Sequence, residues 1–150
     1  DRFLSALTDA YLFYKVTRFD IKGKMHLKTE SKYYICDTGL RNMVLGTQGR
    51  DIGRQIENIA YLELLRRGYT VSIGKAGRGT EIDFVAVREG RTEYFQVSAS
   101  VLDEETLRRE LLPFGQVEDY YPKYLLTLDD FTSDYEGIIH KNLIEWLLEE

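Results

Sequence analysis

The chain has 150 residues, of which 43% are hydrophobic, and a formal net charge of −5 at pH 7. This length suits one core, or one core with a small appendage, and does not favour two full domains. The single cysteine excludes an internal disulfide and a cysteine cluster for zinc, and no apolar stretch is long enough to cross a bilayer. We therefore expect a globular protein of the reducing cytoplasm that has no membrane partner. The first residue is Asp1 rather than Met, which indicates a piece of a longer protein.

The charge is distributed unevenly along the chain. Residues 1–32 hold seven Lys or Arg against four acids, whereas residues 101–150 hold four against thirteen. The C-terminal third would therefore repel a nucleic acid, and a DNA-binding surface is expected on the N-terminal segment or on a second basic group. That group consists of Arg50, Arg54, Arg66, Arg67, Lys75 and Arg78. The basicity is modest compared with that of dedicated DNA-binding proteins.

Residues 1–48 are predicted to form a small winged-helix-like segment and a linker. The elements expected here, in chain order, are a helix to residue 11, a strand over 12–16, a hairpin or wing over 12–36 that ends in a strand at 32–37, and a short helix capped by Asp37 or Thr38. Residues 46–53 are polar and glycine-rich. They form the expected boundary between this segment and a second domain at 49–150.

The second domain is predicted to begin with a long amphipathic helix from residue 52 to residue 67, which stops at Gly68. The elements that follow are strands at 69–73, 80–87 and 91–98, a helix from residue 103 that Pro113 bends or divides, a strand at 124–128, and a last helix capped by Asn142. Three strands in a meander, a crossover helix and a further strand make a mixed sheet with helices on its faces. The sequence therefore predicts an α/β (α+β) fold in the order αβββαβ.

Two acids lie two residues apart in the second of these strands. Alternation along a strand is expected to place Glu81 and Asp83 on one face together with Val85. A carboxylate that faces a core is costly unless it is paired or metal-bound, whereas one that faces solvent costs nothing. Both interpretations stay open for Glu81. Asp83 is the better candidate for a partnered acid, because Ile82 and Phe84 flank it.

The αβββαβ order resembles the core of the restriction-endonuclease-like, or PD-(D/E)XK, superfamily. In that superfamily an acid on the first helix, an Asp on the second strand and a Glu/Gln-x-Lys motif on the third strand converge at one edge of the sheet. The resemblance implies that Glu57, Asp83 and Gln96 are the corresponding catalytic residues and metal ligands. Mg²⁺ suits such a set, since it binds one or two carboxylates together with waters and phosphate oxygens. The ion would activate a water and stabilise charge on the phosphate.

Two departures from the motif weaken the expected site. Gln96 in place of an acid removes one negative charge, so Mg²⁺ is expected to bind weakly or only together with nucleic acid. Ser98 stands where the motif has a lysine, which would position the attacking water and offset the charge of the phosphate. Lys75 is the candidate catalytic substitute, and a solvated turn lysine is the alternative. Taken alone, Glu57 is equally explained as an acid near the N-terminus of a helix, where the macrodipole stabilises it. Glu81 is the other candidate for the second anion beside Asp83.

Several strings go beyond a general pattern. They are residues 9–14 (DAYLFY), 20–24 (DIKGK), 32–41 (KYYICDTGLR), 57–58 (EN), 61–69 (YLELLRRGY) and 81–84 (EIDF). Together they resemble the DUF4143 domain of prokaryotic ATPases over nearly the whole chain. The resemblance implies a longer protein with an upstream AAA-type ATPase domain, a winged-helix segment whose tail is residues 1–36, and this C-terminal nuclease-like domain. ATP would then bind only through the upstream domain, since neither ATPase motif lies in this chain.

Two functions follow from these observations. The first is a degenerate nuclease-like module that gives an ATPase its DNA or protein partner. The alternative is an Mg²⁺-dependent DNA endonuclease, or a structure-specific DNA-processing enzyme, that uses Asp83, Glu57 and Gln96. The expected partners are DNA, the upstream ATPase domain and a second copy of the chain in an ATPase oligomer.

Overall fold

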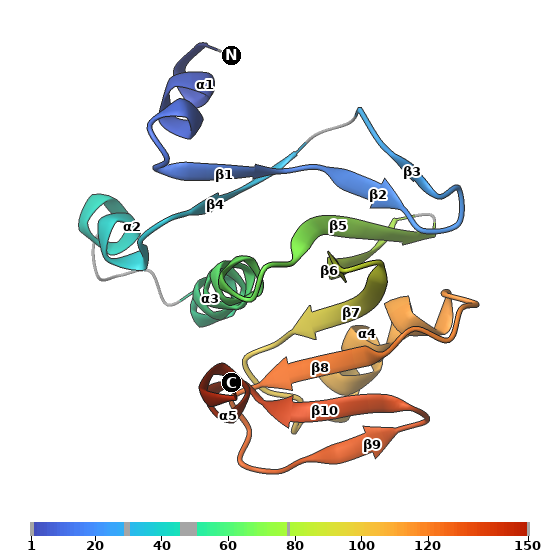
Figure 1. The fold of residues 1–150 in the computed structure, drawn as a ribbon. Helices are drawn as coiled ribbons and strands as arrows, with labels where there is room; N and C mark the ends of the chain where they lie inside the picture. Colours follow the sequence, from blue (N-terminus) through green and yellow to red (C-terminus); the bar gives the residue numbers. More distant parts are fainter. Residues whose placement is uncertain (1, 29–30, 46–50, 78, 150) are drawn as a thin grey trace.

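The computed structural model describes every residue except 1, 29–30, 46–50, 78 and 150, and Figure 1 shows how its elements are arranged. Within these residues an eight-stranded mixed sheet has the strand order β3-β2-β5-β6-β7-β8-β10-β9. Its strands in chain order are β2 (Arg18–Asp20), β3 (Met25–His26), β5 (Thr70–Gly77), β6 (Thr80–Arg88), β7 (Arg91–Val97), β8 (Lys123–Thr127), β9 (Ser133–Tyr135) and β10 (Ile138–Asn142). Strands β5, β6 and β7 form an antiparallel meander, whereas β7, β8 and β10 run parallel.

Helices cover both faces of this sheet. The helices are α1 (Arg2–Asp9), α2 (Thr38–Leu45), α3 (Ile52–Arg66), α4 (Glu104–Gly115) and α5 (Leu143–Leu148). Helices α3 and α5 pack on one face and α4 packs on the other. On α3, Ile56, Ala60 and Leu64 recur at every fourth position and are buried against the sheet. The predicted fold class is therefore confirmed: a mixed sheet with helices on both faces, in the order αβββαβ from α3 to β8.

The N-terminal segment is tied to the main sheet by strands. Strand β1 (Phe13–Val16) pairs antiparallel with β4 (Lys32–Ile35) as a separate two-stranded sheet, and β2 pairs antiparallel with β3. Strand β2 also runs parallel to β5, so the hairpin predicted over 12–36 adds strands to the edge of the main sheet. Helix α1 stands away from that sheet at the N-terminal end (Figure 1). The predicted boundary between 48 and 49 falls outside the described residues, and the division into two domains stays a prediction.

The structure differs from the expected elements in the C-terminal third. Strands β9 and β10 were not predicted, because Ile138 and Ile139 form too short an apolar run before polar residues. Helix α4 is not divided at Pro113 but continues to Gly115. Pro113 has no N–H to donate to the carbonyl of Arg109, so α4 loses this one hydrogen bond and ends two residues later. None of the described helices is long and apolar enough to span a membrane.

The C-terminal end of α3 is fixed by a buried acid. Glu63 accepts hydrogen bonds from Arg66 and Arg67, at 2.6 to 2.7 Å. The hydrogen bonds from Arg66, followed by those from Arg67, hold the pKa of Glu63 below its usual value despite burial. Arg67 also donates to the backbone oxygen of Trp146, and its guanidinium lies over the indole ring. This group joins α3 to α5.

A β-bulge interrupts β6 beside the candidate site. Ser72 is opposite Val85 and Gly74 is opposite Ile82, so β6 carries one extra residue between these pairs. Val85 packs with Ile82 on the α4 side, whereas Phe84 packs on the α3 side. The expectation that Asp83 and Val85 share a face is therefore wrong, because an extra residue breaks the alternation. Gly74 is required opposite the bulge, since a Cβ there would lie 2.8 Å from Val85.

Candidate functional site

The backbone hydrogen bonding between β6 and β7 ends at Asp83. Hydrogen bonds from the backbone to two side chains replace it there. The pairing runs from Arg88 opposite Arg91 to Phe84 opposite Phe95. Beyond this point the Asp83 backbone N–H donates to Oε1 of Gln96 at 3.1 Å, and the Val97 N–H donates to Oδ2 of Asp83 at 2.9 Å. These two bonds satisfy backbone donors and hold the Asp83 carboxylate at the opening between the strands.

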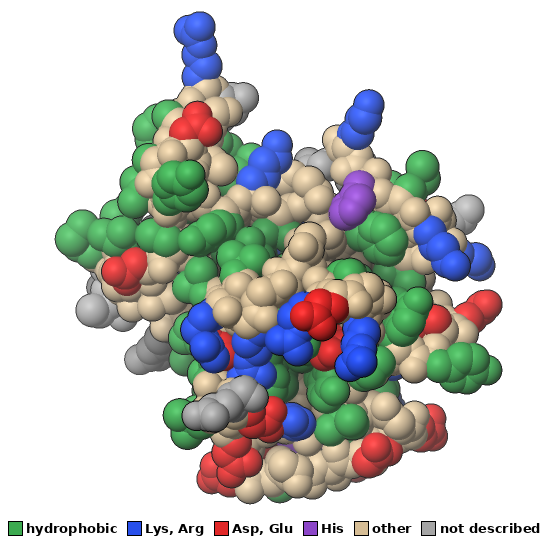
Figure 2. All heavy atoms as spheres, viewed as in Figure 1, with side chains coloured by type: hydrophobic (Ala, Val, Ile, Leu, Met, Phe, Trp, Pro, Cys, Tyr) green, Lys and Arg blue, Asp and Glu red, His purple; other side chains and the backbone are tan. Residues whose placement is uncertain are grey.

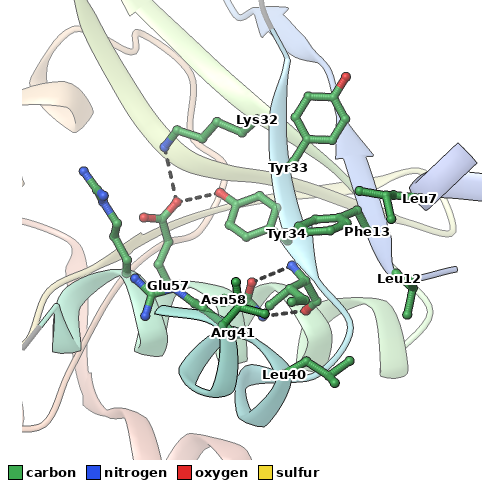
Figure 3. A pocket seen from close by; sticks show the side chains of 13 residues that line it. Leu7, Leu12, Phe13, Lys32, Tyr33, Tyr34, Leu40, Arg41, Glu57 and Asn58 are labelled. Carbon is green, nitrogen blue, oxygen red and sulfur yellow. Dashed lines mark hydrogen bonds and ion pairs between the residues drawn. The ribbon is translucent and has the colours of Figure 1, made fainter. Parts of the chain in front are cut away.

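Glu57 reaches the same region from α3. Its Oε1 accepts from the Tyr34 hydroxyl at 2.5 Å and from Nζ of Lys32 at 3.2 Å, as Figure 3 shows. Lys32 and Tyr34 are two residues apart on β4 and therefore lie on one face of that strand. The Tyr34 ring stacks on Tyr61 with centroids 4.4 Å apart. Burial, followed by the charge of Glu57, raises the pKa of Tyr34 well above its usual value, so the hydroxyl stays a donor.

Asn58 fixes the position of β4 relative to helix α3. Its Nδ2 donates to the backbone oxygen of Ile35 and its Oδ1 accepts from the Ile35 N–H, both at 2.9 Å. The buried side-chain amide of Asn58 thus makes with Ile35 the two backbone hydrogen bonds that a neighbouring strand would otherwise make. Because Asn58 follows Glu57 in the helix, this clamp also fixes the distance from Glu57 to Lys32 and Tyr34.

The site holds more negative than positive charge. Nζ of Lys32 lies 3.2 Å from Oε1 of Glu57 and 4.0 Å from Oδ1 of Asp83. Burial, followed by repulsion from Glu57, raises the pKa of Asp83 to about 7, although Lys32 and the Val97 N–H act in the opposite direction. One ammonium group therefore does not neutralise the two carboxylates. A divalent cation or a second basic group would relieve the remaining repulsion.

The side-chain oxygen donors of the site are two carboxylates and one amide. The described residues contain no group of three or more His, Cys, Asp and Glu side chains arranged to bind a metal. Glu57 and Asp83 offer two carboxylates, which is the number that Mg²⁺ commonly takes from a protein when substrate phosphates and waters complete its shell. Gln96 is partly occupied: its Oε1 accepts from Asp83, and its Nε2 donates to Glu110 on α4 at 2.8 Å. It can add at most its remaining lone pair.

The other predicted residues lie elsewhere. Lys75 is exposed on β5 opposite Glu81, and no described contact joins it to Glu57 or Asp83. Glu81 is paired with Nε of Arg18 at 2.5 Å, beside a second cavity that Lys75 also lines. The hydroxyl of Ser98 donates to the backbone oxygen of Ser100 at 3.3 Å. Lys32 occupies the position beside the acids that was considered for Lys75, and no local sequence pattern indicated it.

A cavity of about 840 Å³ opens beside Glu57, between α1, α2 and β4 (Figure 3). Its apolar lining includes Leu7, Leu12, Phe13, Tyr33, Leu40 and Val44. Lys32, Arg41 and Arg54 line it as well, and one guanidinium nitrogen of Arg41 is buried with no hydrogen-bond partner among the described residues. Figure 2 shows hydrophobic side chains gathered over this N-terminal part, whereas basic and acidic side chains are interleaved at the centre of the visible face. The cavity therefore combines apolar walls with a cationic lining near the acids.

Comparison with known proteins gives a relative over almost the whole of this chain. A Haemophilus influenzae protein described as "Uncharacterized protein" is 38% identical to this chain over 149 residues. The match covers 99% of this chain and 36% of the relative, so the chain spans little more than a third of that protein's length. No family model and no solved structure matches the chain. The name of the relative assigns no activity.

Proposed function

We propose that this chain is a nuclease-like domain that binds the phosphate backbone of DNA, as part of a longer cytoplasmic ATPase of the DUF4143 type. The observation that carries the proposal is the meeting of Glu57 and Asp83 around the ammonium group of Lys32, at 3.2 and 4.0 Å. Two acids that come from a helix and from the opening of two strands form the arrangement expected for a metal-dependent phosphodiester site. The upstream ATPase domain and an oligomer of copies belong to the same proposal and are supported by the sequence resemblance.

The chemistry of the site supports a phosphate ligand. The two carboxylates favour a divalent cation, which when bound would lower the pKa of a water molecule and neutralise charge on a phosphate. Because Gln96 adds no charge, the cation would bind weakly unless phosphate oxygens complete its shell. The residues around the acids have separate roles: the Val97 N–H orients Asp83, and Tyr34 orients Glu57.

A second candidate is an Mg²⁺-dependent DNA endonuclease or a structure-specific DNA-processing enzyme. The observation that favours it is again Lys32, because an ammonium group close to both acids could serve in place of the lysine that is absent at Ser98. Cleavage and binding are separable by experiment. The binding module needs only the phosphate contacts, whereas cleavage also needs an activated water.

Fluorescence anisotropy with labelled single-stranded, duplex and branched DNA tests the proposal. We expect binding that weakens linearly in a plot of log affinity against log salt concentration, since phosphate contacts release counterions. Mn²⁺ should tighten binding by the wild type and not by Asp83→Ala, with the exposed-residue variant Asp130→Ala as the matched control. Gel analysis of the same DNA after incubation with Mg²⁺ or Mn²⁺ decides the second candidate. Absence of DNA binding at about 50 mM salt, with or without metal, would contradict the proposal.

A further inference from the structure

The position of Lys32 is set by contacts that do not involve its own charge. Strand β4 is held by pairing with β1, in which Val16 lies opposite Lys32. It is also held by the two hydrogen bonds between Asn58 and Ile35. Tyr34, the neighbour on the same face, is buried and stacked on Tyr61. The backbone that carries Lys32 is therefore placed against α3 whether or not the ion pair forms.

Among the lysines and arginines that the structure describes, Lys32 is the one within ion-pair distance of both Glu57 and Asp83. Its ammonium group lies 3.2 Å from Glu57 and 4.0 Å from Asp83, and 34% of its side chain stays exposed. It donates a hydrogen bond to Glu57 alone among the described residues, which leaves two of its three N–H groups for a ligand. Lys75, the residue first considered for this role, forms no hydrogen bond or ion pair with either acid among the described contacts.

This geometry gives Lys32 two opposite effects on ligands. In the free protein the ammonium group neutralises part of the charge of Glu57 and Asp83, so it competes with a divalent cation for the same carboxylates. Toward a nucleic acid it is a phosphate donor on the exposed side of the acids, and it offsets the repulsion between carboxylates and phosphate. A lysine that only paired with the two acids would produce the first effect but not the second.

We propose that Lys32 is the phosphate-binding cation of this site, in the place of the lysine absent at Ser98, and that strand β4 thereby completes the site. This inference rests on the proposed function, because it assumes that the acids receive a phosphate. It also assigns the N-terminal segment a direct part in ligand binding. Residues 32–35 and α3 then form one functional unit.

Three variants test this inference: Lys32→Met removes the charge, Lys32→Arg keeps it, and Lys15→Met is the matched control. Lys15 is an exposed lysine on β1 of the same two-stranded sheet, so its loss changes the net charge equally. Binding of Mn²⁺ alone is measured by calorimetry, and binding of a short labelled duplex without metal is measured by anisotropy. Thermal unfolding of each variant verifies that it is folded.

For Lys32→Met we expect Mn²⁺ to bind several-fold more tightly than to Lys15→Met, and DNA to bind about tenfold more weakly. The slope of log affinity against log salt should fall by about one, the amount expected for one lost phosphate contact. Lys32→Arg should restore most of the DNA affinity. If Lys32→Met binds Mn²⁺ more tightly but binds DNA as well as Lys15→Met does, Lys32 only pairs with the acids and its role toward phosphate is overturned.

The opposite results separate this inference from the proposed function. Equal Mn²⁺ and DNA binding by Lys32→Met and Lys15→Met, with Mn²⁺ binding lost in Asp83→Ala, would overturn the role of Lys32 and leave the proposed function standing. If neither the wild type nor a folded variant binds Mn²⁺ or DNA, the proposed function fails and the role of Lys32 fails with it.

Discussion

The raised pKa of Asp83 predicts that its carboxylate destabilises the free protein at alkaline pH. Burial and the charge of Glu57 move this pKa from 3.8 to about 7. A group whose pKa is higher in the folded state than in the unfolded state stabilises the fold when it is protonated. This contribution is complete at a pH below the pKa of the unfolded state, and it is lost as the pH rises through the pKa of the folded state. A difference of about 3 between the two pKa values corresponds to about 4 kcal/mol at pH 8.

Asp83→Asn removes the charge and keeps an oxygen that can accept from the Val97 N–H. We therefore expect this variant to be more stable than the wild type by up to about 4 kcal/mol at pH 8, by about 2 kcal/mol at pH 5, and by little near pH 4. Urea unfolding, followed by the fluorescence of the single buried Trp146, measures the difference. The Asp130→Asn variant, at an exposed position, is the control that measures how the loss of one surface carboxylate changes the free energy of unfolding. A variant less stable than the wild type at pH 8, or a gain that does not change with pH, would refute this account of Asp83.

Three further substitutions test the supports of the site and of α3. Tyr34→Phe removes the hydroxyl that donates to Glu57. Urea unfolding should show that the free energy of unfolding falls by about 1.5–3 kcal/mol, whereas Tyr33→Phe at an exposed position should change it very little. Asn58→Ala should cost about 2–4 kcal/mol and speed hydrogen exchange at the Ile35 amide, and unchanged exchange there would contradict the clamp. Glu63→Gln should show the opposite pH dependence to the Asp83 variant, because its two arginine partners lower this pKa. We expect a loss of about 1–3 kcal/mol at pH 7 that narrows as pH falls below about 4.5, and a loss independent of pH would contradict it.

Local patterns were sufficient to predict the central elements of the fold. The four-residue spacing of apolar side chains defined α3, and the short apolar run at 124–128 defined β8 within one residue at each end. The resemblance to the PD-(D/E)XK superfamily then implied that Glu57, Asp83 and Gln96 would lie close together. Glu57 and Asp83 both lie within ion-pair distance of Lys32, whereas Gln96 accepts from the Asp83 N–H and donates to Glu110 on α4.

The missing parts of the prediction depend on contacts between distant residues. The bulge at Asp83 is a property of the register between β5 and β6, which alternation within one strand does not show. Lys32 reaches the site because Asn58 binds the backbone of Ile35, and such a clamp has no periodic signature in the sequence. Lys75 was considered because it lies at the end of the strand that precedes the one with Asp83, but its side chain is exposed and lies opposite Glu81.

The most direct test of the central claim is calorimetric titration of Mn²⁺ and Mg²⁺ into the wild type and Asp83→Ala, with and without a short DNA duplex. If Glu57 and Asp83 form a metal and phosphate site, the wild type binds the cation, binds it more tightly with DNA present, and loses this binding when Asp83 is replaced. Heat of binding that is the same in both proteins, or absent from both with DNA present, would contradict the account.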